Sequence, residues 1–153
     1  MRLIIGPLRW RDAFAISRWH YPDPYTIYDM NMFVPMCIEQ VLALFGTHLF
    51  YHALDEHGEL IGFFSLVQRD GDVEIGVGLR PDLTGRGMGL DFVQAGIEYA
   101  RNTFHPAHFR LDVAEFNQRA MRVYERAGFV PVQTITRHIG RAAVECMEMI
   151  RDA

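Results

Sequence analysis

The chain has 153 residues, of which 50% are hydrophobic, and a formal net charge of -4 at pH 7. This length and composition are typical of one globular domain, expected to span residues 1–153, and exclude a disordered chain. All 15 basic residues are arginines scattered along the sequence, so no basic stripe indicates nucleic acid binding and no lysine is available for Schiff-base chemistry.

The lengths of the apolar segments and the number of cysteines indicate in which cellular compartment the protein is expected. The sequence lacks the run of about 18 apolar residues that a membrane helix needs, and its apolar N-terminal stretch is too short for a secretory signal. Cys37 and Cys146 are too few for a disulfide framework, and their apolar neighbours are typical of buried free thiols. We therefore expect a cytoplasmic protein that makes no membrane contact.

The first half of the chain predicts a short helix-containing segment followed by a meander. Prolines and aromatic residues make the segment after the first helix irregular, and turns at His57-Gly58 and Asp70-Gly71 join antiparallel strands. The expected elements are a strand at 2–5, a helix at 9–19, an irregular segment at 20–35, a short helix at 37–45, and strands at 49–54, 60–67 and 73–79.

The second half alternates helices and strands. The unit from the strand at 73–79 through a helix to the strand at 109–114 predicts a parallel pair with a right-handed crossover. The fold class is therefore α/β, with a mixed, mostly antiparallel sheet flanked by about four helices. The further expected elements are helices at 90–104 and 118–127, the second stopped by Gly128, and strands at 109–114, 130–136 and 143–150.

A glycine-rich loop, Thr84-Gly85-Arg86-Gly87-Met88-Gly89, follows a predicted strand and opens a predicted helix. A helix N-terminus has unpaired N–H groups and a positive dipole end, and glycines let the backbone approach a ligand closely. The loop therefore predicts a phosphate or pyrophosphate site, to which Arg86 could add a charge. It lacks the ending of a P-loop and the spacing of a dinucleotide loop. A simple glycine-rich turn is the alternative.

The strand before this loop carries two glycines on one face. Val73, Ile75, Val77 and Leu79 are expected on one side, with Glu74, Gly76 and Gly78 on the other. Glycines in a strand often mark the close approach of another group.

A second motif lies at the following helix. Asn117 is in an N-cap position, and Tyr124 lies nearly two turns further on the same face, with the small Ala120 between them. A narrow ligand could run along this face. The alternative is a capping Asn and a core Tyr.

Together these motifs resemble the GNAT acetyltransferase superfamily. Its pattern is Gln/Arg-x-x-Gly-x-Gly/Ala at a helix start, then Asn-x-x-Ala-x-x-x-Tyr and a terminal Gly-Phe. The loop matches the first motif except at Thr84, and Asn117, Ala120, Tyr124, Gly128 and Phe129 match the second. The resemblance covers most of the chain and implies a GNAT-like fold.

The resemblance also implies acetyl-CoA as cosubstrate, without a metal. The pyrophosphate would lie on the backbone of Gly85, Arg86, Gly87, Met88 and Gly89, and Asn117 would contact the pantetheine arm. The Leu79 N–H would polarise the thioester carbonyl. Thr84 replaces the usual Gln or Arg, so a side-chain contact to phosphate is lost or moves to Arg86.

The implied reaction is the direct attack of a primary amine on acetyl-CoA in a ternary complex. Tyr124 is the expected acid, since a phenol with a pKa near 10 is protonated at neutral pH. Asp112 and Glu74 are competing candidates for the base, with an ion pair to an arginine as the alternative for both. No Ser-His-Asp arrangement is expected, and the histidines predict no metal site.

The acceptor pocket is expected in the irregular segment that carries Trp19, Tyr21, Tyr25 and Tyr28, whose rings could hold an amine by cation–π contact or simply pack as satellite core. The expected partner is an amine-bearing small molecule or peptide, and the resemblance is compatible with a homodimer. A catalytically idle CoA-binding or sensing module is the main alternative function, and an unrelated phosphate-binding domain is another.

Overall fold

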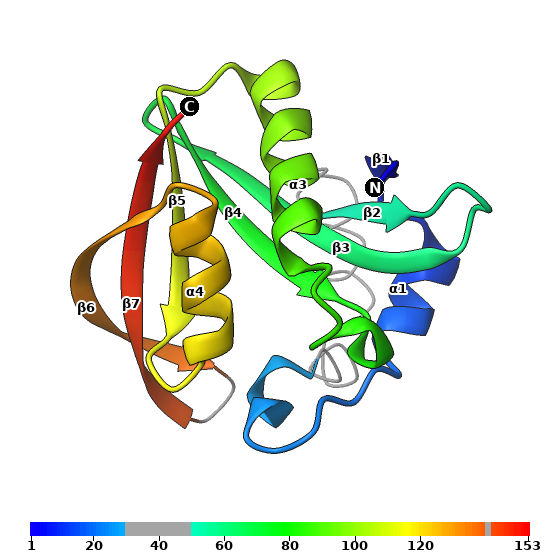
Figure 1. The fold of residues 1–153 in the computed structure, drawn as a ribbon, viewed down its shortest axis with the longest axis horizontal. Coiled ribbons are helices and arrows are strands. Elements are labelled where there is room, and N and C mark those ends of the chain that lie inside the picture. Colours follow the sequence, from blue (N-terminus) through cyan, green and yellow to red (C-terminus); the bar gives the residue numbers. More distant parts are fainter. Residues whose placement is uncertain (30–49, 140–141) are drawn as a thin grey trace. The chain divides into compact units, whose positions relative to one another are not determined.

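The computed structural model describes residues 1–29, 50–139 and 142–153 (Figure 1). Seven strands form one sheet in the order β1-β2-β3-β4-β5-β7-β6. β4 and β5 run parallel, whereas β1–β2, β2–β3, β5–β7 and β6–β7 are antiparallel pairs. The predicted mixed, mostly antiparallel sheet with one parallel pair is confirmed.

The elements follow the predicted order. The helix expected at 37–45 lies outside the described residues, in which three α-helices occur. The strands are β1 (Ile4–Pro7), β2 (Phe50–Leu54), β3 (Leu60–Arg69), β4 (Asp72–Leu79), β5 (His108–Ala114), β6 (Val130–Ile139) and β7 (Ala142–Asp152). The helices are α1 (Trp10–Ile16), α3 (Gly89–Phe104) and α4 (Gln118–Arg126), with 3₁₀ turns η1 (Tyr25–Tyr28) and η3 (Pro81–Leu83).

The chain divides into two compact units. The first unit comprises Arg2–Ser65 and Val77–Thr84, and the second comprises Met1, Leu66–Gly76 and Gly85–Ala153. The expectation of a single domain over residues 1–153 stays a prediction.

In the first unit, a buried polar cluster ties α1 to β2. Asp12, with 3% of its surface exposed, accepts bonds from the Arg9 Nε at 2.6 Å and from the Arg9 backbone N–H at 3.2 Å. The Nδ1 of His52 on β2 lies 2.9 Å from the same carboxylate. Burial alone would raise the pKa of Asp12, but its bonds to Arg9 and His52 outweigh burial and lower that pKa. A buried charge is thus paired, as its desolvation requires.

The second unit contains the helices α3 and α4 and the strands β5, β7 and β6 (Figure 1). β5 alternates buried and partly exposed residues, as predicted for a half-buried strand. The predicted turn at Asp70-Gly71 is present, with φ of 52° and 85°, as a type I′ hairpin requires. Gly128 has φ of 92° after the end of α4, which is the left-handed cap that the sequence predicts. The largest side chains of the core in this unit are Phe92, Ile97, Phe109, Leu111, Phe129 and Met149.

No helix in the described part of the chain is long and apolar enough to cross a membrane.

Candidate functional site

The glycine loop has the backbone of an anion-binding turn. Gly85 and Gly87 have φ of 72° and 79°, the left-handed region that glycine adopts without strain. Met88 then returns to the right-handed helical region, and α3 begins at Gly89. Successive residues of opposite hand aim their N–H groups into one concavity. Residues 85–87 are exposed, so this part of the loop is accessible from solvent.

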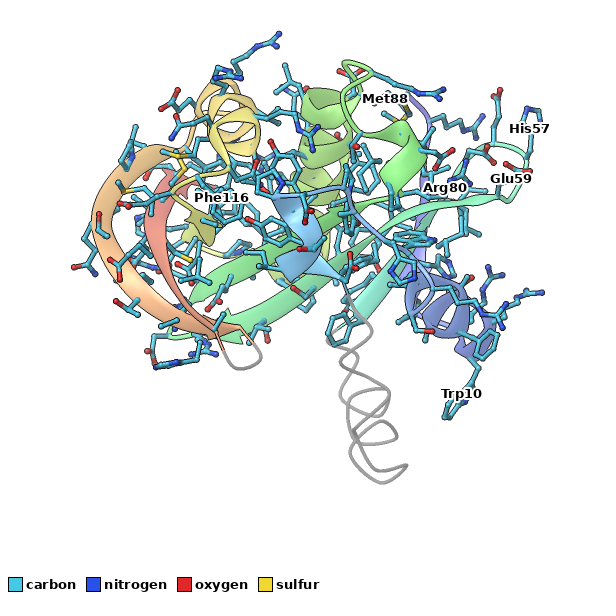
Figure 2. The ribbon with its side chains drawn as sticks, turned by 90° about the horizontal axis from the view of Figure 1, so that it is seen from below. Trp10, His57, Glu59, Arg80, Met88 and Phe116 are labelled. Carbon is cyan, nitrogen blue, oxygen red and sulfur yellow. The ribbon has the colours of Figure 1, made fainter. Side chains whose placement is uncertain are left out.

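The start of α3 keeps its donors available. Among the described residues, no side chain caps the helix at Met88, which Figure 2 labels. The first turn of an α-helix has N–H groups without intrahelical partners, and the helix dipole is positive there. The loop and helix start therefore present several backbone donors to a negatively charged group.

Thr84, at the end of the first unit, points back into its own turn. Its hydroxyl donates to the Pro81 carbonyl at 2.8 Å. Thr84 thus uses its polar group to close η3, which favours the prediction that a side-chain phosphate contact at this position is lost.

Arg119 on α4 is a candidate that the sequence motifs did not single out. Its Nη1 lies 3.6 Å from the position that a Cβ on Gly85 would occupy. A guanidinium beside exposed backbone donors adds a positive charge suited to a phosphate. The signal in the sequence was an arginine two residues after Asn117, but only the folded chain brings it to the loop.

The glycine at position 89 is explained by the close packing of two helices. A Cβ there would lie 3.3 Å from the Val123 Cγ2 of α4. The third glycine of the loop thus lets α3 and α4 approach closely. The loop combines a ligand-ready turn at Gly85 and Gly87 with a packing position at Gly89.

The α4 motif forms as predicted at its first residue. Asn117 caps the helix, because its side-chain oxygen accepts a bond from the Ala120 N–H at 3.1 Å, and only 9% of the residue is exposed. Tyr124 is half-buried, and its ring packs edge-on against Phe129 with centroids 6.1 Å apart. The capping role of Asn117 is confirmed, and the catalytic role of Tyr124 stays a prediction.

Both candidate bases are paired with arginines. Arg137 on β6 places Nε and Nη2 at 2.8 and 2.7 Å from the same Asp112 oxygen. Burial lowers the pKa of Arg137, but the charge and hydrogen bond of Asp112, together with the charges of Glu74 and Cys146, outweigh burial and leave that pKa raised. Glu74 lies 3.5 Å from the Nε of Arg69, and both side chains are well exposed. Asp112 is therefore held tightly, whereas Glu74 has a long, solvent-screened ion pair.

At the end of β4, in the first unit, the packing of a neighbouring side chain accounts for the glycine at position 78. A Cβ on Gly78 would lie 2.1 Å from the Phe63 ring, so only glycine fits without a shift. The predicted close approach is confirmed at Gly78, and the approaching group is a side chain of the protein. The predicted burial alternation holds for Val73 and Ile75, but Gly78 on the opposite face is also buried because Phe63 covers it.

Two of the aromatic residues expected to hold an amine make internal contacts. The Trp19 ring lies 6.2 Å from the Phe63 ring, and the Tyr21 hydroxyl donates to the Leu79 carbonyl at 2.8 Å. Tyr25 and Tyr28 lie in η1. These contacts favour the packing alternative for Trp19 and Tyr21. In Figure 2, Trp10 of α1 projects outward instead, with 58% of its surface exposed.

Two of the described histidines lie near the end of α3 and the start of β5. His105 caps the end of α3, and His108 lies 3.0 Å from Asp72. Within the described ranges, no group of three or more His, Cys, Asp or Glu residues could hold a metal ion.

A family model described as an acetyltransferase (GNAT) domain matches residues 2–130, so the chain belongs to this family. Residues of the chain are 38% identical over 88 positions to a mycothiol acetyltransferase of Propionibacterium freudenreichii, covering 54% of this chain and 28% of that protein. The corresponding protein of Salinispora tropica is 35% identical over 86 residues, covering 52% and 28%. The match therefore spans little more than a quarter of the length of these relatives.

Solved structures share the fold. A chimera of spermidine N-acetyltransferase from Vibrio cholerae and hSSAT superimposes with a TM-score of 0.80 and 18% identity, covering 99% of this chain and 96% of that one. The spermidine N-acetyltransferase from Vibrio cholerae in complex with CoA and spermine gives a TM-score of 0.76 and 17% identity, covering 98% and 95%. At these identities the similarity supports the fold.

Proposed function

We propose that the protein is an N-acetyltransferase that moves the acetyl group of acetyl-CoA to a primary amine within a ternary complex. The observation that carries this proposal is the loop at 85–89, whose left-handed glycines open an uncapped α3 in a chain of the GNAT family. A loop of this kind is suited to a pyrophosphate. Acetyl-CoA contains one.

The residues of the second unit fit this cosubstrate. The backbone N–H groups of Gly85 to Gly89, in a loop whose residues 85–87 are exposed, would take the pyrophosphate, and the Arg119 guanidinium beside Gly85 would add a charge-assisted bond. Asn117, whose side-chain oxygen caps α4, would contact the pantetheine arm, as its match to the family motif implies. Arg86, fully on the exposed part of the loop, would reach a peripheral phosphate.

The chemistry assigned to the chain consists of three tasks. The Leu79 N–H donates to the thioester oxygen as negative charge develops there. A carboxylate removes a proton from the ammonium form of the acceptor, whose amine then bonds to the acyl carbon while the carbon–sulfur bond breaks. Tyr124 gives a proton to the departing thiolate. The attacking nitrogen loses its second proton as the amide forms, and this proton restores the Tyr124 phenol, so the products are the amide, free CoA and a protonated carboxylate.

Glu74 is the stronger of the two candidate bases. Its 3.5 Å contact with Arg69 is long and exposed, so little is lost when the carboxylate takes a proton. Protonation of Asp112 would break the two short contacts to Arg137. We therefore assign the base to Glu74 and a structural ion pair to Asp112.

The acceptor class is an amine-bearing small molecule. Two observations support it: a family member with the same fold is named for spermidine, and further relatives are named for mycothiol. A location in the cytoplasm and a homodimer stay predictions.

A CoA-binding module without catalysis is the second candidate function. The observation that favours it is the arginine partner of each candidate carboxylate. This module would bind CoA through the same loop and release no thiol from acetyl-CoA when amines are added.

The test is the release of CoA thiol from acetyl-CoA in the presence of a panel of primary amines, including polyamines. We expect Tyr124→Phe to lower turnover by roughly 10- to 1000-fold, the range for loss of a general acid, with little change in acetyl-CoA affinity. Tyr99→Phe removes the same hydroxyl from α3 and serves as the matched control. Unchanged turnover in Tyr124→Phe would remove this residue from the mechanism. CoA binding without turnover in the wild type would favour the idle module.

A further inference from the structure

The last peptide of β4 is held at both of its polar groups. The Leu79 carbonyl accepts a bond from the Tyr21 hydroxyl at 2.8 Å, across 58 positions of sequence. The N–H of the same peptide, on Arg80, donates to the Ile61 carbonyl of β3 at 2.8 Å. A peptide bonded on both sides has a fixed plane. The strand end is therefore set by one neighbouring strand and one side chain.

The backbone of Tyr21 is held by Asp29. Its backbone N–H donates to Asp29 Oδ1 at 2.8 Å, and the Asp29 side chain is only 11% exposed. The second Asp29 oxygen lies 3.1 Å from His20 Nδ1. Burial, and then the Asp29 charge, raise the pKa of Tyr21. Its hydroxyl therefore stays protonated and keeps donating over the working range of pH.

Aromatic side chains also pack against the end of β4, on the face that carries Gly78. The Phe63 ring fills the space over Gly78, and it is flanked by the rings of Trp19 and Phe50 at 6.2 and 6.4 Å. Gly78 and Leu79 thus have little freedom to rotate. Within the first unit, the aromatic segment and β3 combine to fix this short stretch of backbone.

The Leu79 carbonyl that Tyr21 bonds belongs to the same residue as the proposed oxyanion donor, the Leu79 N–H. In an extended strand, the N–H and C=O of one residue point to the same side. The Leu79 N–H therefore leaves β4 on the side where Tyr21 holds the Leu79 carbonyl. We propose that Tyr21 is a positioning residue for acetyl transfer, whose hydroxyl fixes the Leu79 backbone so that its N–H is preset for the thioester oxygen. This inference rests on the proposed function.

The advantage is preorganisation. A donor aimed at the site of developing charge lowers the barrier most when it needs no rearrangement during the reaction. Without the Tyr21 hydroxyl, the Leu79 carbonyl would turn toward water or toward the acceptor ammonium. The Leu79 N–H belongs to the preceding peptide but is joined to this carbonyl through the Leu79 Cα, so a loosened carbonyl frees the Leu79 backbone torsions and lets the N–H leave its preset direction. Tyr21 thus acts on the reaction through the backbone and not through contact with the amine.

The test compares Tyr21→Phe with the control Tyr99→Phe. We expect kcat to fall by about 10-fold, because a misplaced Leu79 N–H stabilises the developing charge less well. The Kd for acetyl-CoA, measured by calorimetry, should change less than twofold. The infrared stretch of the bound thioester carbonyl, labelled with ¹³C, reports its polarisation. This band should move toward the frequency of free acetyl-CoA in Tyr21→Phe and stay in place in Tyr99→Phe.

A second pair of variants tests the anchor of Tyr21. Asp29→Asn keeps an oxygen for the Tyr21 N–H and should retain most of the wild-type kcat, whereas Asp29→Ala should lower kcat in the same direction as Tyr21→Phe. A wild-type kcat and carbonyl band in Tyr21→Phe would overturn the inference and leave the proposed function intact. A Kd that rises in step with the loss of kcat, or a variant that does not fold, would assign Tyr21 a structural role and also overturn it. Failure of the wild type to bind acetyl-CoA would instead overturn the proposed function.

Discussion

Two short segments, one in each compact unit, differ in how their backbone polar groups are bonded. In the second unit, the loop at 85–89 leaves N–H groups open to solvent through left-handed glycines and an uncapped helix start. In the first unit, side chains donate to backbone carbonyls at the end of β4 and the start of β3: the Tyr21 hydroxyl bonds the Leu79 carbonyl, and the Arg80 Nη1 bonds the Leu60 carbonyl at 2.9 Å. Backbone N–H groups without a protein partner are suited to binding an anion, whereas bonded carbonyls fix the strand that carries them. Substitutions in the loop at 85–89 should therefore lower acetyl-CoA affinity, whereas substitutions at the end of β4 should leave that affinity nearly unchanged.

The largest effect is expected at Gly78 in the first unit. Gly78→Ala would place a methyl group 2.1 Å from the Phe63 ring, which the Trp19 and Phe50 rings flank. Overpacking of this kind costs about 1–3 kcal/mol. We expect a loss at the upper end of this range in the free energy of unfolding, measured with urea.

A double-mutant cycle with Phe63→Leu isolates the contact. The shorter side chain lacks the two ring atoms nearest to the added methyl group, so Gly78→Ala should cost much less in that background. Equal costs in both backgrounds would show that the Phe63 ring is not the reason for glycine at this position.

An intermediate effect is expected at Gly87 in the second unit. Gly87→Ala puts a side chain at φ of 79°, which strains the backbone by roughly 1–2 kcal/mol, and on the face proposed to receive pyrophosphate. We expect acetyl-CoA affinity to fall by about 10-fold, since the close approach of phosphate to backbone is lost. Isothermal calorimetry measures this change.

Gly58→Ala is the matched control for Gly87→Ala. Gly58 has φ of 80° in the β2–β3 turn, and at both glycines a new Cβ meets no atom within 4 Å. The two variants should lose similar stability, but only Gly87→Ala should lose affinity. Equal affinity in both would contradict the assignment of the loop to the cosubstrate.

The smallest effect is a change in the pH dependence of stability. The pKa of Asp12 in the folded chain lies below its ordinary value of 3.8, so its carboxylate contributes stability above that value and loses it as pH falls through the folded pKa. Wild-type melting temperature should therefore fall as pH drops below about 4. Asp12→Asn should start lower and show a flatter acid limb, by circular dichroism from pH 7 to 3. A Glu98→Gln variant on α3 is the control, and an acid limb as steep in Asp12→Asn as in the wild type would contradict this role of Asp12.

Local patterns in the sequence predicted most of the fold. The Asp70-Gly71 turn, the Asn117 cap and the left-handed Gly128 follow from short-range preferences, so their elements lie where expected. Boundaries shifted where tertiary pairing decides them. The helix expected at 9–19 ends at Ile16, and the strand expected at 130–136 continues to Ile139 through its pairing with β7.

Contacts between distant residues could not be predicted. The Asp112–Arg137 pair spans 25 positions and the Tyr21–Leu79 bond spans 58, and no periodicity relates such positions. The proximity of Arg119 to Gly85 likewise depends on how α4 packs on α3. The glycine loop could be identified as a candidate site because its signal is local, whereas the partners that tune the site arise from folding.

Thermal-shift titration with acetyl-CoA, CoA and NAD in parallel tests the central claim that this loop binds CoA. A ligand that binds only the folded chain stabilises it by about 2.7 kcal/mol at a hundredfold excess over its Kd. We expect both CoA species to raise the melting temperature and NAD to leave it unchanged. No shift with either CoA species would contradict the account.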